Sequence, residues 1–427
     1  MTESIRKVAV IGGSRIPFCR SNTVYAEKTN LDMLAAALQG LVDRFELGGE
    51  QLDEVVAGAV TTHSKDWNLA REALLSTGLS PLTPGITLQQ ACGTSLQAAL
   101  GVAAKIAAGQ IECGIAAGSD STSDAPVVFR RKFARRLIRL SQARSLGQRM
   151  HTLRGFSFRE LAPQPPANAE PRTGLSMGQH CERMVREWEV TREQQDLLAA
   201  ESHHKAAAAW NDGFFDPLVQ SWGGLARDNN IRGDTSPEKL AALRTAFGKG
   251  PEATLTAGNS TPLTDGAAAV LLASEEWASR KGLPVQAYLT AGQTAAVDFV
   301  RDEGLLMAPT VAVSELLNRT GYALQDFEHY EIHEAFAAQV LCTLKAWESE
   351  TYCRQRLGRE QALGSIDRAR MNTRGGSIAV GHPFAATGAR ILGTLAQILA
   401  DEGPGKGLIS VCTAGGMGVA AILERHG

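Results

Sequence analysis

The stretch Gln89–Gln90–Ala91–Cys92–Gly93–Thr94–Ser95 lies where two kinds of structure are predicted to meet. The preceding residues 84–88 are short and partly β-branched, which favours a buried strand. Residues 95–108 are rich in Ala and Leu and lack Pro, which predicts a tightly packed helix. Cys92 therefore belongs to a strand-to-helix turn, with Thr94 or Ser95 as the expected N-cap.

A thiol in this turn faces free backbone N–H groups and the positive end of a helix dipole. Both favour its thiolate form. A cysteine that is simply buried in a tight turn would have the same local sequence. The stretch alone leaves both interpretations open, and the rest of the chain has to decide between them.

Length and composition limit the classes of protein to which this chain can belong. The chain has 427 residues, a net charge of −2, 44% hydrophobic and 21% charged residues, which is ordinary for a globular protein of two or three lobes. No apolar run is long enough for a transmembrane helix, and the N-terminus leaves no room for a signal peptide. The seven cysteines form no CxxC pair, so we expect no disulfide framework, no metal site and a reducing, cytoplasmic location.

The chain alternates predicted strands and helices, which indicates an α/β layered fold. Strands are expected at 7–13, 52–60, 84–88 and 111–118, with helices at 31–45, 67–77 and 95–108. The order strand, turn, helix, strand, Gly-rich turn recurs at 375–423, where strands are expected at 375–380, 407–412 and 419–423 and a helix at 387–400. This recurrence predicts a duplicated unit with pseudo-two-fold symmetry, which would bring the Cys92 and His382 turns together.

An insertion interrupts the α/β pattern. Residues 1–126 with 251–275 are expected to form an N-terminal half, 127–250 an inserted loop or lid domain, and 276–427 a C-terminal half. The insertion contains a helical stretch at 177–209. It begins with a basic segment that carries no acid between its first and last arginine: Arg130, Arg131, Lys132, Arg135, Arg136, Arg139, Arg144, Arg149 and Arg154.

Four short motifs carry chemistry: Cys92 in Gln–Ala–Cys–Gly–Thr–Ser, His333 in His–Glu–Ala–Phe–Ala, His382 in Gly–His–Pro, and Cys412 in Cys–Thr–Ala–Gly–Gly–Met–Gly. Each alone is a weak signal. In this order and on this repeat, together with the run from Thr256 to Ala269, they resemble the thiolase family over nearly the whole chain. The resemblance is strongest to the thiolase (β) subunit of the trifunctional fatty-acid β-oxidation complex.

The resemblance implies a 3-ketoacyl-CoA thiolase, with acyl-CoA and coenzyme A as substrates and no other cofactor. A thiolate nucleophile can accept an acyl group as a thioester, which is the role implied for Cys92. His382 would act as its base and Cys412 as the acid and base at carbon. His333 and His382 would bind the enolate oxygen, and the backbone N–H groups of Cys92 and Ala414 the thioester oxygen.

Two residues depart from the family pattern. His333 stands where most thiolases have Asn, and Ala414 where most have Gly; the backbone N–H of Ala414 is expected to serve all the same. Thr261 occupies the place of a serine that contacts coenzyme A in many relatives, and Pro262 beside it alters the local backbone.

Alternative functions stay open at this point. A short-chain acetyl-CoA acetyltransferase would use the same residues. A decarboxylating ketoacyl synthase shares the nucleophilic cysteine but lacks a second catalytic cysteine, and a non-catalytic carrier would not need the complete set. Cys19, Cys113, Cys181, Cys342 and Cys353 are assigned no role.

The basic segment at 127–154 interleaves arginines with Phe133, Leu137, Ile138 and Leu140. This pattern predicts one amphipathic basic helix over residues 127–150. It can be a solvated lid face, or a contact for a membrane surface or for the hydratase/dehydrogenase α subunit of the resembled complex. No nucleic-acid-binding motif accompanies the charge. The family also implies a homodimer or homotetramer.

Overall fold

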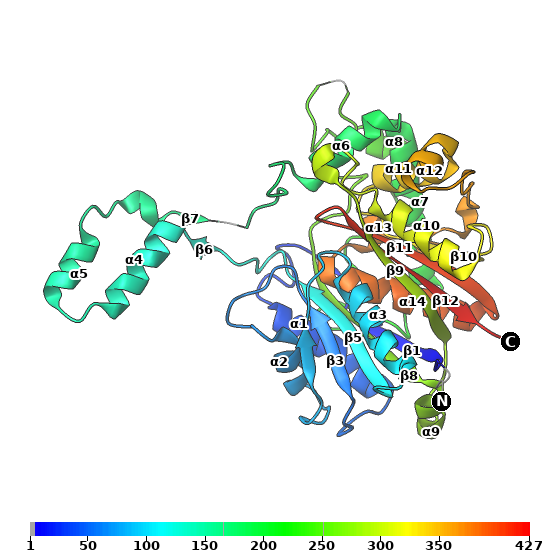
Figure 1. Ribbon diagram of the computed structural model, residues 1–427, viewed down its shortest axis with the longest axis horizontal. Helices are drawn as coiled ribbons and strands as arrows, with labels where there is room; N and C mark the ends of the chain where they lie inside the picture. The colour runs from blue at the N-terminus through cyan, green and yellow to red at the C-terminus, as the bar shows by residue number, and fades with distance from the viewer. Residues whose placement is uncertain (1–4, 165, 251) are drawn as a thin grey trace.

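The computed structural model describes residues 5–164, 166–250 and 252–427, and its main body is built on one twisted sheet (Figure 1). The strand order is β10-β11-β12-β9-β1-β8-β5-β3-β4, with the short β2 paired to β8. The N-terminal part of this fold consists of β1 (Val8–Arg15), β2 (Cys19–Arg20), α1 (Asn30–Arg44), β3 (Glu54–Gly58), α2 (Leu69–Leu75), β4 (Gly85–Thr87), α3 (Thr94–Ala107), β5 (Cys113–Asp120), β8 (Thr264–Ser274) and α9 (Glu275–Lys281).

The C-terminal part contains β9 (Ala287–Ala296), α10 (Ala308–Thr320), β10 (His329–Ile332), α11 (Ala337–Glu348), α12 (Glu350–Arg356), α13 (Ser377–Val380), α14 (Thr387–Glu402), β11 (Gly405–Thr413) and β12 (Met417–Arg425). Short 3-10 turns lie at Phe158–Leu161, Phe299–Arg301, Arg368–Arg370 and Phe384–Ala386. The two parts join where β1 pairs with β9.

The predicted duplication is confirmed by the sheet. Outward from the β1–β9 junction, one side runs β1-β8-β5-β3-β4 and the other β9-β12-β11-β10. In both, the second strand is antiparallel to its neighbours and the outer strands are parallel. The counterpart of β4 is reduced to one parallel bridge between Tyr330 and Met371. The equivalent turns after β4 and after α13 therefore face one another.

Helices α3 and α14 form the middle layer of the fold. Their apolar faces share a buried cluster with one face of both halves of the sheet, including Val270 of β8 and Val411 of β11. On the opposite face, α1, α2 and α9 cover the N-terminal strands, and α10 and α11 cover the C-terminal ones. Side chains alternate between the two faces along β8, as the period of a strand requires. The predicted layered α/β fold with two duplicated halves is confirmed.

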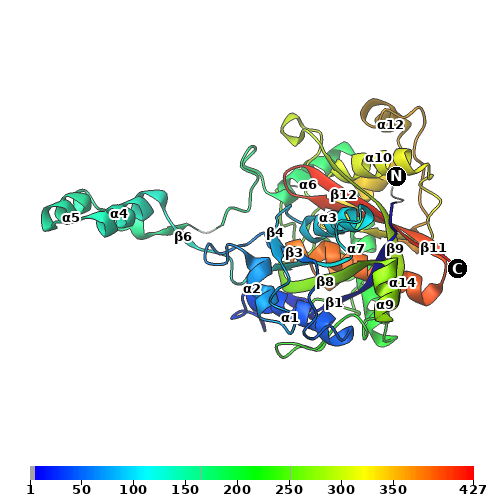
Figure 2. The ribbon, with the colours of Figure 1, turned by 60° about the horizontal axis from the view of Figure 1, so that its bottom comes forward.

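The insertion has two different parts. Helices α6 (Met177–Glu187), α7 (Arg192–Asn211) and α8 (Pro237–Ala241) pack on the body. The basic segment instead forms an arm of β6 (Val128–Phe129), α4 (Arg131–Gln142), α5 (Leu146–Leu153) and β7 (Pro163–Gln164) that extends away from the body in both views (Figures 1 and 2). The proposed domain boundaries at 127–250 stay a prediction.

Four local predictions were wrong. The predicted strand at 375–380 is instead a turn followed by the short helix α13. The buried Glu334 carboxylate accepts the Ile378 N–H, and Gly376 leaves room for that carboxylate because a Cβ there would collide with it. The helical stretch 177–209 is two helices, separated by Glu189 at φ +48°. Residues 127–150 hold two helices, α4 and part of α5, rather than one. Gly93, and neither Thr94 nor Ser95, is the N-cap of α3.

No helix within the described residues is both long and apolar enough to span a membrane.

Candidate active site

The Cys92 turn is folded by its own side chains. Thr94 Oγ1 donates to the Ala91 carbonyl at 2.7 Å and accepts the Gln90 N–H at 2.9 Å. These bonds hold Ala91 at φ +47°, a left-handed conformation that is costly for a residue with a Cβ. Such strain persists where the surrounding structure fixes it, as it does at this turn between β4 and α3. The Cys92 side chain is consequently aimed at the second half of the molecule.

His382 reaches Cys92 from the equivalent turn of the second copy. Its Nε2 lies 3.1 Å from Cys92 Sγ, and its Nδ1 lies 2.5 Å from Thr387 Oγ1. Gly381, at φ +112°, lets the chain leave α13 and turn towards the sheet. Thr387 fixes the ring from behind, so the imidazole has one nitrogen for orientation and one for the thiol.

His333 lies beside His382 at the end of β10. The two ring centroids are 4.2 Å apart. His333 Nδ1 lies 2.8 Å from Ser377 Oγ, while its Nε2 is buried and has no hydrogen-bond partner among the described residues. One donor atom from each of Cys92, His333 and His382 lies within 4.8 Å of the others. The His333 ring therefore belongs to the same small site as the Cys92 thiol.

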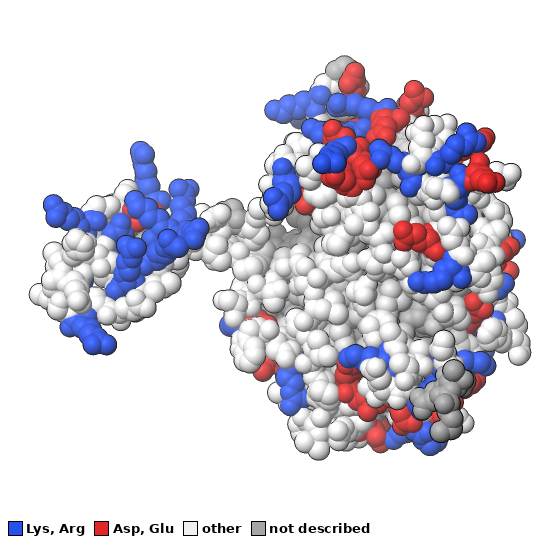
Figure 3. All heavy atoms as spheres, viewed as in Figure 1, with Lys and Arg blue, Asp and Glu red and all other residues white. Residues whose placement is uncertain are grey.

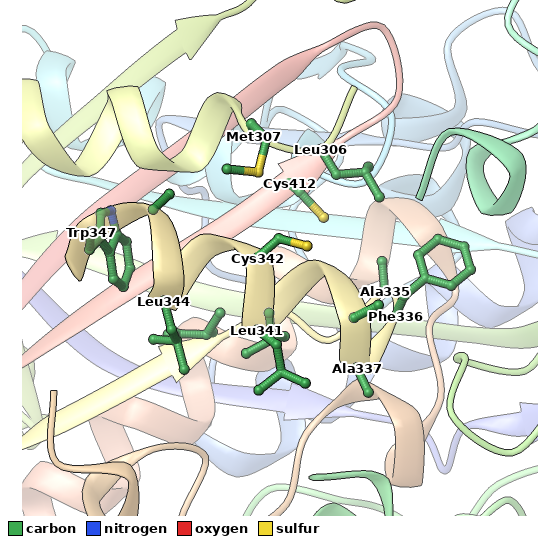
Figure 4. Packing of buried hydrophobic residues seen from close by; sticks show 14 of the residues in the cluster. Leu306, Met307, Ala335, Phe336, Ala337, Leu341, Cys342, Leu344, Trp347 and Cys412 are labelled. Atoms are coloured by element: carbon green, nitrogen blue, oxygen red, sulfur yellow. The ribbon is translucent and has the colours of Figure 1, made fainter. Parts of the chain in front are cut away.

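Cys412 closes the site from the end of β11. Its thiol is buried among Leu306, Met307 and Cys342, as Figure 4 shows. A Cβ on Gly93, next to Cys92, would come within 3.0 Å of Thr413 Cγ2, next to Cys412. The two cysteine-bearing segments thus lie side by side. Cys92, His333 and His382 form one cluster, and the effect of Cys92 on the pKa of Cys412 shows that this thiol is near them.

The Gly-rich turn after Cys412 is fixed by hydrogen bonds to two other segments. Its Gly415 N–H donates to Glu170 Oε1 at 2.9 Å, and its Gly416 carbonyl accepts the Val297 N–H at 2.8 Å. The backbone N–H of Ala414, just before these two glycines, opposes the rise in the pKa of the Cys92 thiol. Its role as an oxyanion donor stays a prediction.

Burial sets the charge state of the site. It raises the pKa of the Cys92 thiol to about 12, with the Ala414 and Cys92 N–H groups opposing and the Asp120 charge adding to the rise. It also raises the pKa of the Cys412 thiol, and the nearby Cys92 adds to that rise. Desolvation outweighs the N–H groups that the sequence suggested would favour a resting thiolate.

The two imidazoles shift in the opposite direction. Burial, then Arg390, lowers the pKa of His382 to about 3. Burial, then His382, then Arg390, lowers the pKa of His333 well below its usual range. The site therefore rests as two thiols and two neutral imidazoles near neutral pH. A thiol 3.1 Å from a neutral imidazole can transfer its proton as its sulfur attacks a carbonyl carbon.

Two further predictions concern ligands. Thr261 Oγ1 donates to the Ser377 carbonyl at 2.9 Å, so its hydroxyl is already used within the protein; contact with coenzyme A stays a prediction. Cys92, His333 and His382 are also a donor set that could hold a metal ion. The prediction that no metal or cofactor is required is untested.

Several residues that shape the site escaped sequence reasoning. Asp120 accepts the N–H groups of Val60, Thr61 and Ala385, and so ties the His382 turn to the ends of β3 and β5. Ser377, Thr387 and Arg390 support the two histidines. Ser377, Thr387 and Arg390 flank the Gly–His–Pro motif, but the sequence alone does not show which hydroxyl meets which ring; the partners of Asp120 are in addition distant in the sequence.

Family models match almost the entire chain. The description "Thiolase, N-terminal domain" fits residues 8–276, and "Thiolase, C-terminal domain" fits residues 283–425. A 3-ketoacyl-CoA thiolase of Vibrio cholerae is 41% identical, with 99% of this chain and 98% of that protein covered. A 3-ketoacyl-CoA thiolase of Escherichia coli is also 41% identical, with 98% and 97% covered.

Solved structures similar to this chain include members of the same family. The acetyl-CoA acetyltransferase of Bacillus anthracis has a TM-score of 0.82 at 28% identity, with both chains covered in full. The Acat5 thiolase of Ascaris suum, solved in complex with coenzyme A, has a TM-score of 0.81 at 26% identity, with 99% of this chain and 100% of that chain covered.

Proposed function

Because the chain belongs to the thiolase family, we propose that it cleaves 3-ketoacyl-CoA with coenzyme A through an acyl group held on Cys92. The protein is an acyltransferase of fatty-acid metabolism, as are the 3-ketoacyl-CoA thiolases to which it is 41% identical. The observation that carries the assignment of roles is the 3.1 Å contact between Cys92 Sγ and His382 Nε2.

The first half of the reaction breaks the carbon–carbon bond. Cys92 Sγ attacks the 3-keto carbon while its proton moves to His382 Nε2, so no resting thiolate is needed. The bond between C2 and C3 then breaks, and the electron pair passes to the acetyl-CoA enolate. Cys412 protonates this enolate at carbon and releases acetyl-CoA, leaving the acyl group on Cys92.

The second half transfers the acyl group. The Cys412 thiolate takes the proton of an incoming coenzyme A thiol, whose sulfur attacks the acyl-Cys92 carbonyl. The Cys92 thiolate leaves and recovers its proton from His382, which restores the four neutral groups. Hydrogen bonds from the N–H groups of Cys92 and Ala414 to the thioester oxygen, and from His333 and His382 to the enolate oxygen, are each worth roughly 3 kcal/mol of barrier.

A replacement of Cys412 by Ser tests this assignment against a series of 3-ketoacyl-CoA substrates from four to sixteen carbons. We expect kcat to fall by roughly 10²–10⁴-fold at every chain length, because a hydroxyl is a much weaker acid for the enolate. Cys353→Ser, at a buried cysteine away from the site, is the matched control. Full activity of Cys412→Ser would refute the role of Cys412.

The same series separates the two candidate activities. Turnover of the sixteen-carbon substrate supports a degradative 3-ketoacyl-CoA thiolase. Turnover of acetoacetyl-CoA alone would instead assign a short-chain acetyl-CoA acetyltransferase, the activity named for the Bacillus anthracis neighbour.

The basic arm supports a proposed contact with an anionic membrane surface. Its α4 presents Arg131, Arg135 and Arg139 together with the exposed Leu137 and Ile138. Figure 3 shows the Lys and Arg side chains gathered on this arm beside an uncharged surface. By contrast, Lys132 and Arg136 are paired with Glu160 and stabilise the arm itself. Lipid contact needs both a cationic and an apolar face.

Replacement of Arg131, Arg135 and Arg139 by Gln should weaken co-sedimentation with vesicles that contain phosphatidylserine, and leave the low binding to pure phosphatidylcholine unchanged. The control removes three exposed arginines from the body: Arg280, Arg301 and Arg354. Unchanged sedimentation would count against the membrane and leave an α subunit as the arm's partner.

We also propose a homodimer or homotetramer in the cytoplasm. Strand β4 is the last in the sheet order, and its Ile86 is 43% exposed, so a second copy could pair there. All seven cysteines are free, which suits a reducing compartment. Ile86→Lys should shift the sedimentation velocity towards that of a monomer.

A further inference from the structure

We propose that Ser377 and Arg390 are positioning residues that hold His333 in one tautomer, with its proton on Nε2, so that the ring donates a hydrogen bond into the active site. This inference rests on the proposed function, because it gives the donor role of His333 a physical cause. Neither the Ser377 hydroxyl nor the Arg390 side chain is hydrogen-bonded to Cys92 or His382 in the contacts described above.

The three groups form a chain behind the histidine. Arg390 Nη2 donates to Ser377 Oγ at 2.6 Å, and Ser377 Oγ lies 2.8 Å from His333 Nδ1. All three side chains are buried: His333 and Ser377 are 0% exposed and Arg390 is 4% exposed. Within the described residues, Ser377 Oγ has no hydrogen-bond partner besides these two.

The donors and acceptors that each of these three groups offers determine where the protons lie. A guanidinium only donates, so Ser377 Oγ must accept from Arg390. The hydroxyl then has one proton to give, and His333 Nδ1 is the acceptor within reach. If Nδ1 carried the proton instead, the buried serine hydroxyl would be a donor without an acceptor, which is costly. The proton of the neutral ring therefore belongs on Nε2.

Nε2 is the His333 nitrogen left for the chemistry, because Nδ1 faces Ser377. It is buried and has no partner among the described residues, and its ring has a nitrogen within 4.8 Å of the Cys92 and His382 donor atoms. A donor left unpaired in a buried site is unfavourable unless a ligand atom satisfies it. An oxyanion of the substrate is such an atom, so the orphaned N–H marks where that oxygen binds.

Arg390 also lies near a buried carboxylate. Glu331, two residues before His333 on β10, places Oε2 3.9 Å from Arg390 Nη1 and is 2% exposed. The guanidinium thus lies between a carboxylate and the serine hydroxyl, and its hydrogen bond is to the hydroxyl. Its positive charge also opposes protonation of His333, which keeps the ring a neutral donor.

The helix α13 makes this chain possible. Residues 377–380 wind as a helical turn instead of an edge strand because Glu334 accepts the Ile378 N–H and Ser202 Oγ accepts the Gly376 N–H. This turn places the first residue of α13, Ser377, against His333. In the first copy the segment before the Cys92 turn is the strand β4 rather than a helix.

The decisive measurement is the ¹⁵N spectrum of the full protein labelled at its histidine nitrogens, with the His333 signals identified by their loss in His333→Ala. We expect a protonated Nε2 and an unprotonated Nδ1 in the wild type as a single form. A protonated Nδ1 would overturn the proposal, and this result does not depend on any serine variant folding correctly.

Ser377→Ala should then lose this single form. We expect kcat to fall about tenfold to a hundredfold at nearly constant KM, less than the roughly 10²–10³-fold expected when an oxyanion donor is lost outright. Ser377→Thr, which keeps the hydroxyl, should recover both the spectrum and most of the rate. The matched control is Ser119→Ala, since Ser119 is a buried serine whose hydroxyl has no partner in the described chain. An unchanged spectrum in Ser377→Ala would overturn the proposal.

The proposed function fails in a different way. If His333 carries its proton on Nε2 but His333→Ala retains full activity, the tautomer is confirmed while the oxyanion role of His333 is refuted. If Nδ1 carries the proton and His333→Ala loses activity, the role of His333 stands and the part given to Ser377 and Arg390 is refuted.

Discussion

The Cys92 turn and the His382 turn occupy equivalent places in the two copies of the fold, yet they are built differently. The first follows the strand β4 and is closed by Thr94, which holds Ala91 in a left-handed conformation. The second follows the short helix α13 and is closed by Thr387, which holds the imidazole itself. In the first turn a strained backbone orients the Cys92 sulfur, whereas in the second turn the Thr387 hydroxyl orients the His382 ring.

Both turns pack against one pair of glycines in the first copy of the fold. Gly58 of β3 and Gly118 of β5 are register partners in the sheet. A Cβ on Gly58 would collide with the Leu88 carbonyl before the Cys92 turn, and a Cβ on Gly118 with the Ala385 carbonyl after His382. Duplication brings the turns together, and the two adjacent glycines let both approach the sheet closely enough to meet.

The comparison predicts the largest effect at the nucleophile. Cys92→Ala should lower kcat for thiolysis by at least about 10⁴-fold, because no other group can hold the acyl chain. The thermal midpoint should change little, since one sulfur is removed. Cys113→Ala, at a buried cysteine of β5, is the control and should retain activity. Acyl transfer by Cys92→Ala would overturn the assignment of the first turn.

Removing the base should have a smaller effect. His382→Ala is expected to lower kcat by roughly 10³-fold, within the usual range for general acid–base catalysis. Mass spectrometry after mixing with acyl-CoA should show slow acylation of Cys92. His329→Gln, at a half-buried histidine of β10, should act like the wild type. A loss below tenfold in His382→Ala would show that another group takes the thiol proton.

The two glycines allow each turn to be displaced separately. Gly118→Ala should move the His382 turn and Gly58→Ala the Cys92 turn, each with a loss of about 10²-fold in kcat and a destabilisation of about 1–3 kcal/mol from overpacking. Gly101→Ala in α3 is the matched control, because a Cβ there meets nothing within 4 Å and Ala favours the helix. Equal activity of all three variants would show that close approach of the turns is unnecessary.

Among these predictions, a change of pH should have the smallest effect on activity. The pKa of His382 is lowered to about 3, so the neutral base persists far below 6.5, and kcat/KM should vary less than about twofold between pH 6 and 8. An inflection near 6.5 would contradict this. The histidine takes up its proton on unfolding, so the stability it supports above pH 6.5 is lost as the pH falls towards 3, at up to about 1.4 kcal/mol per pH unit. Thermal melts across this range test the sign.

Local sequence was enough to predict most of the scaffold. The helix at 31–45 and the strand at 111–118 lie within a few residues of α1 and β5, because hydrophobic periodicity and helix propensity act over short distances. The repeat of motifs also predicted the symmetry of the sheet. Where a residue outside the segment decides its shape, as Glu334 does for residues 375–380, the same reasoning failed.

The order of residues along the chain thus determined which side chains are candidates for the chemistry, since Cys92, His333, His382 and Cys412 stand out within their own motifs. Only the tertiary structure decided their charge and their hydrogen bonds. Cys92 and His382 are 290 residues apart, and the burial that keeps both neutral arises only when the two halves close around α3 and α14. Desolvation is a property of that assembled environment, so no stretch of sequence contains it.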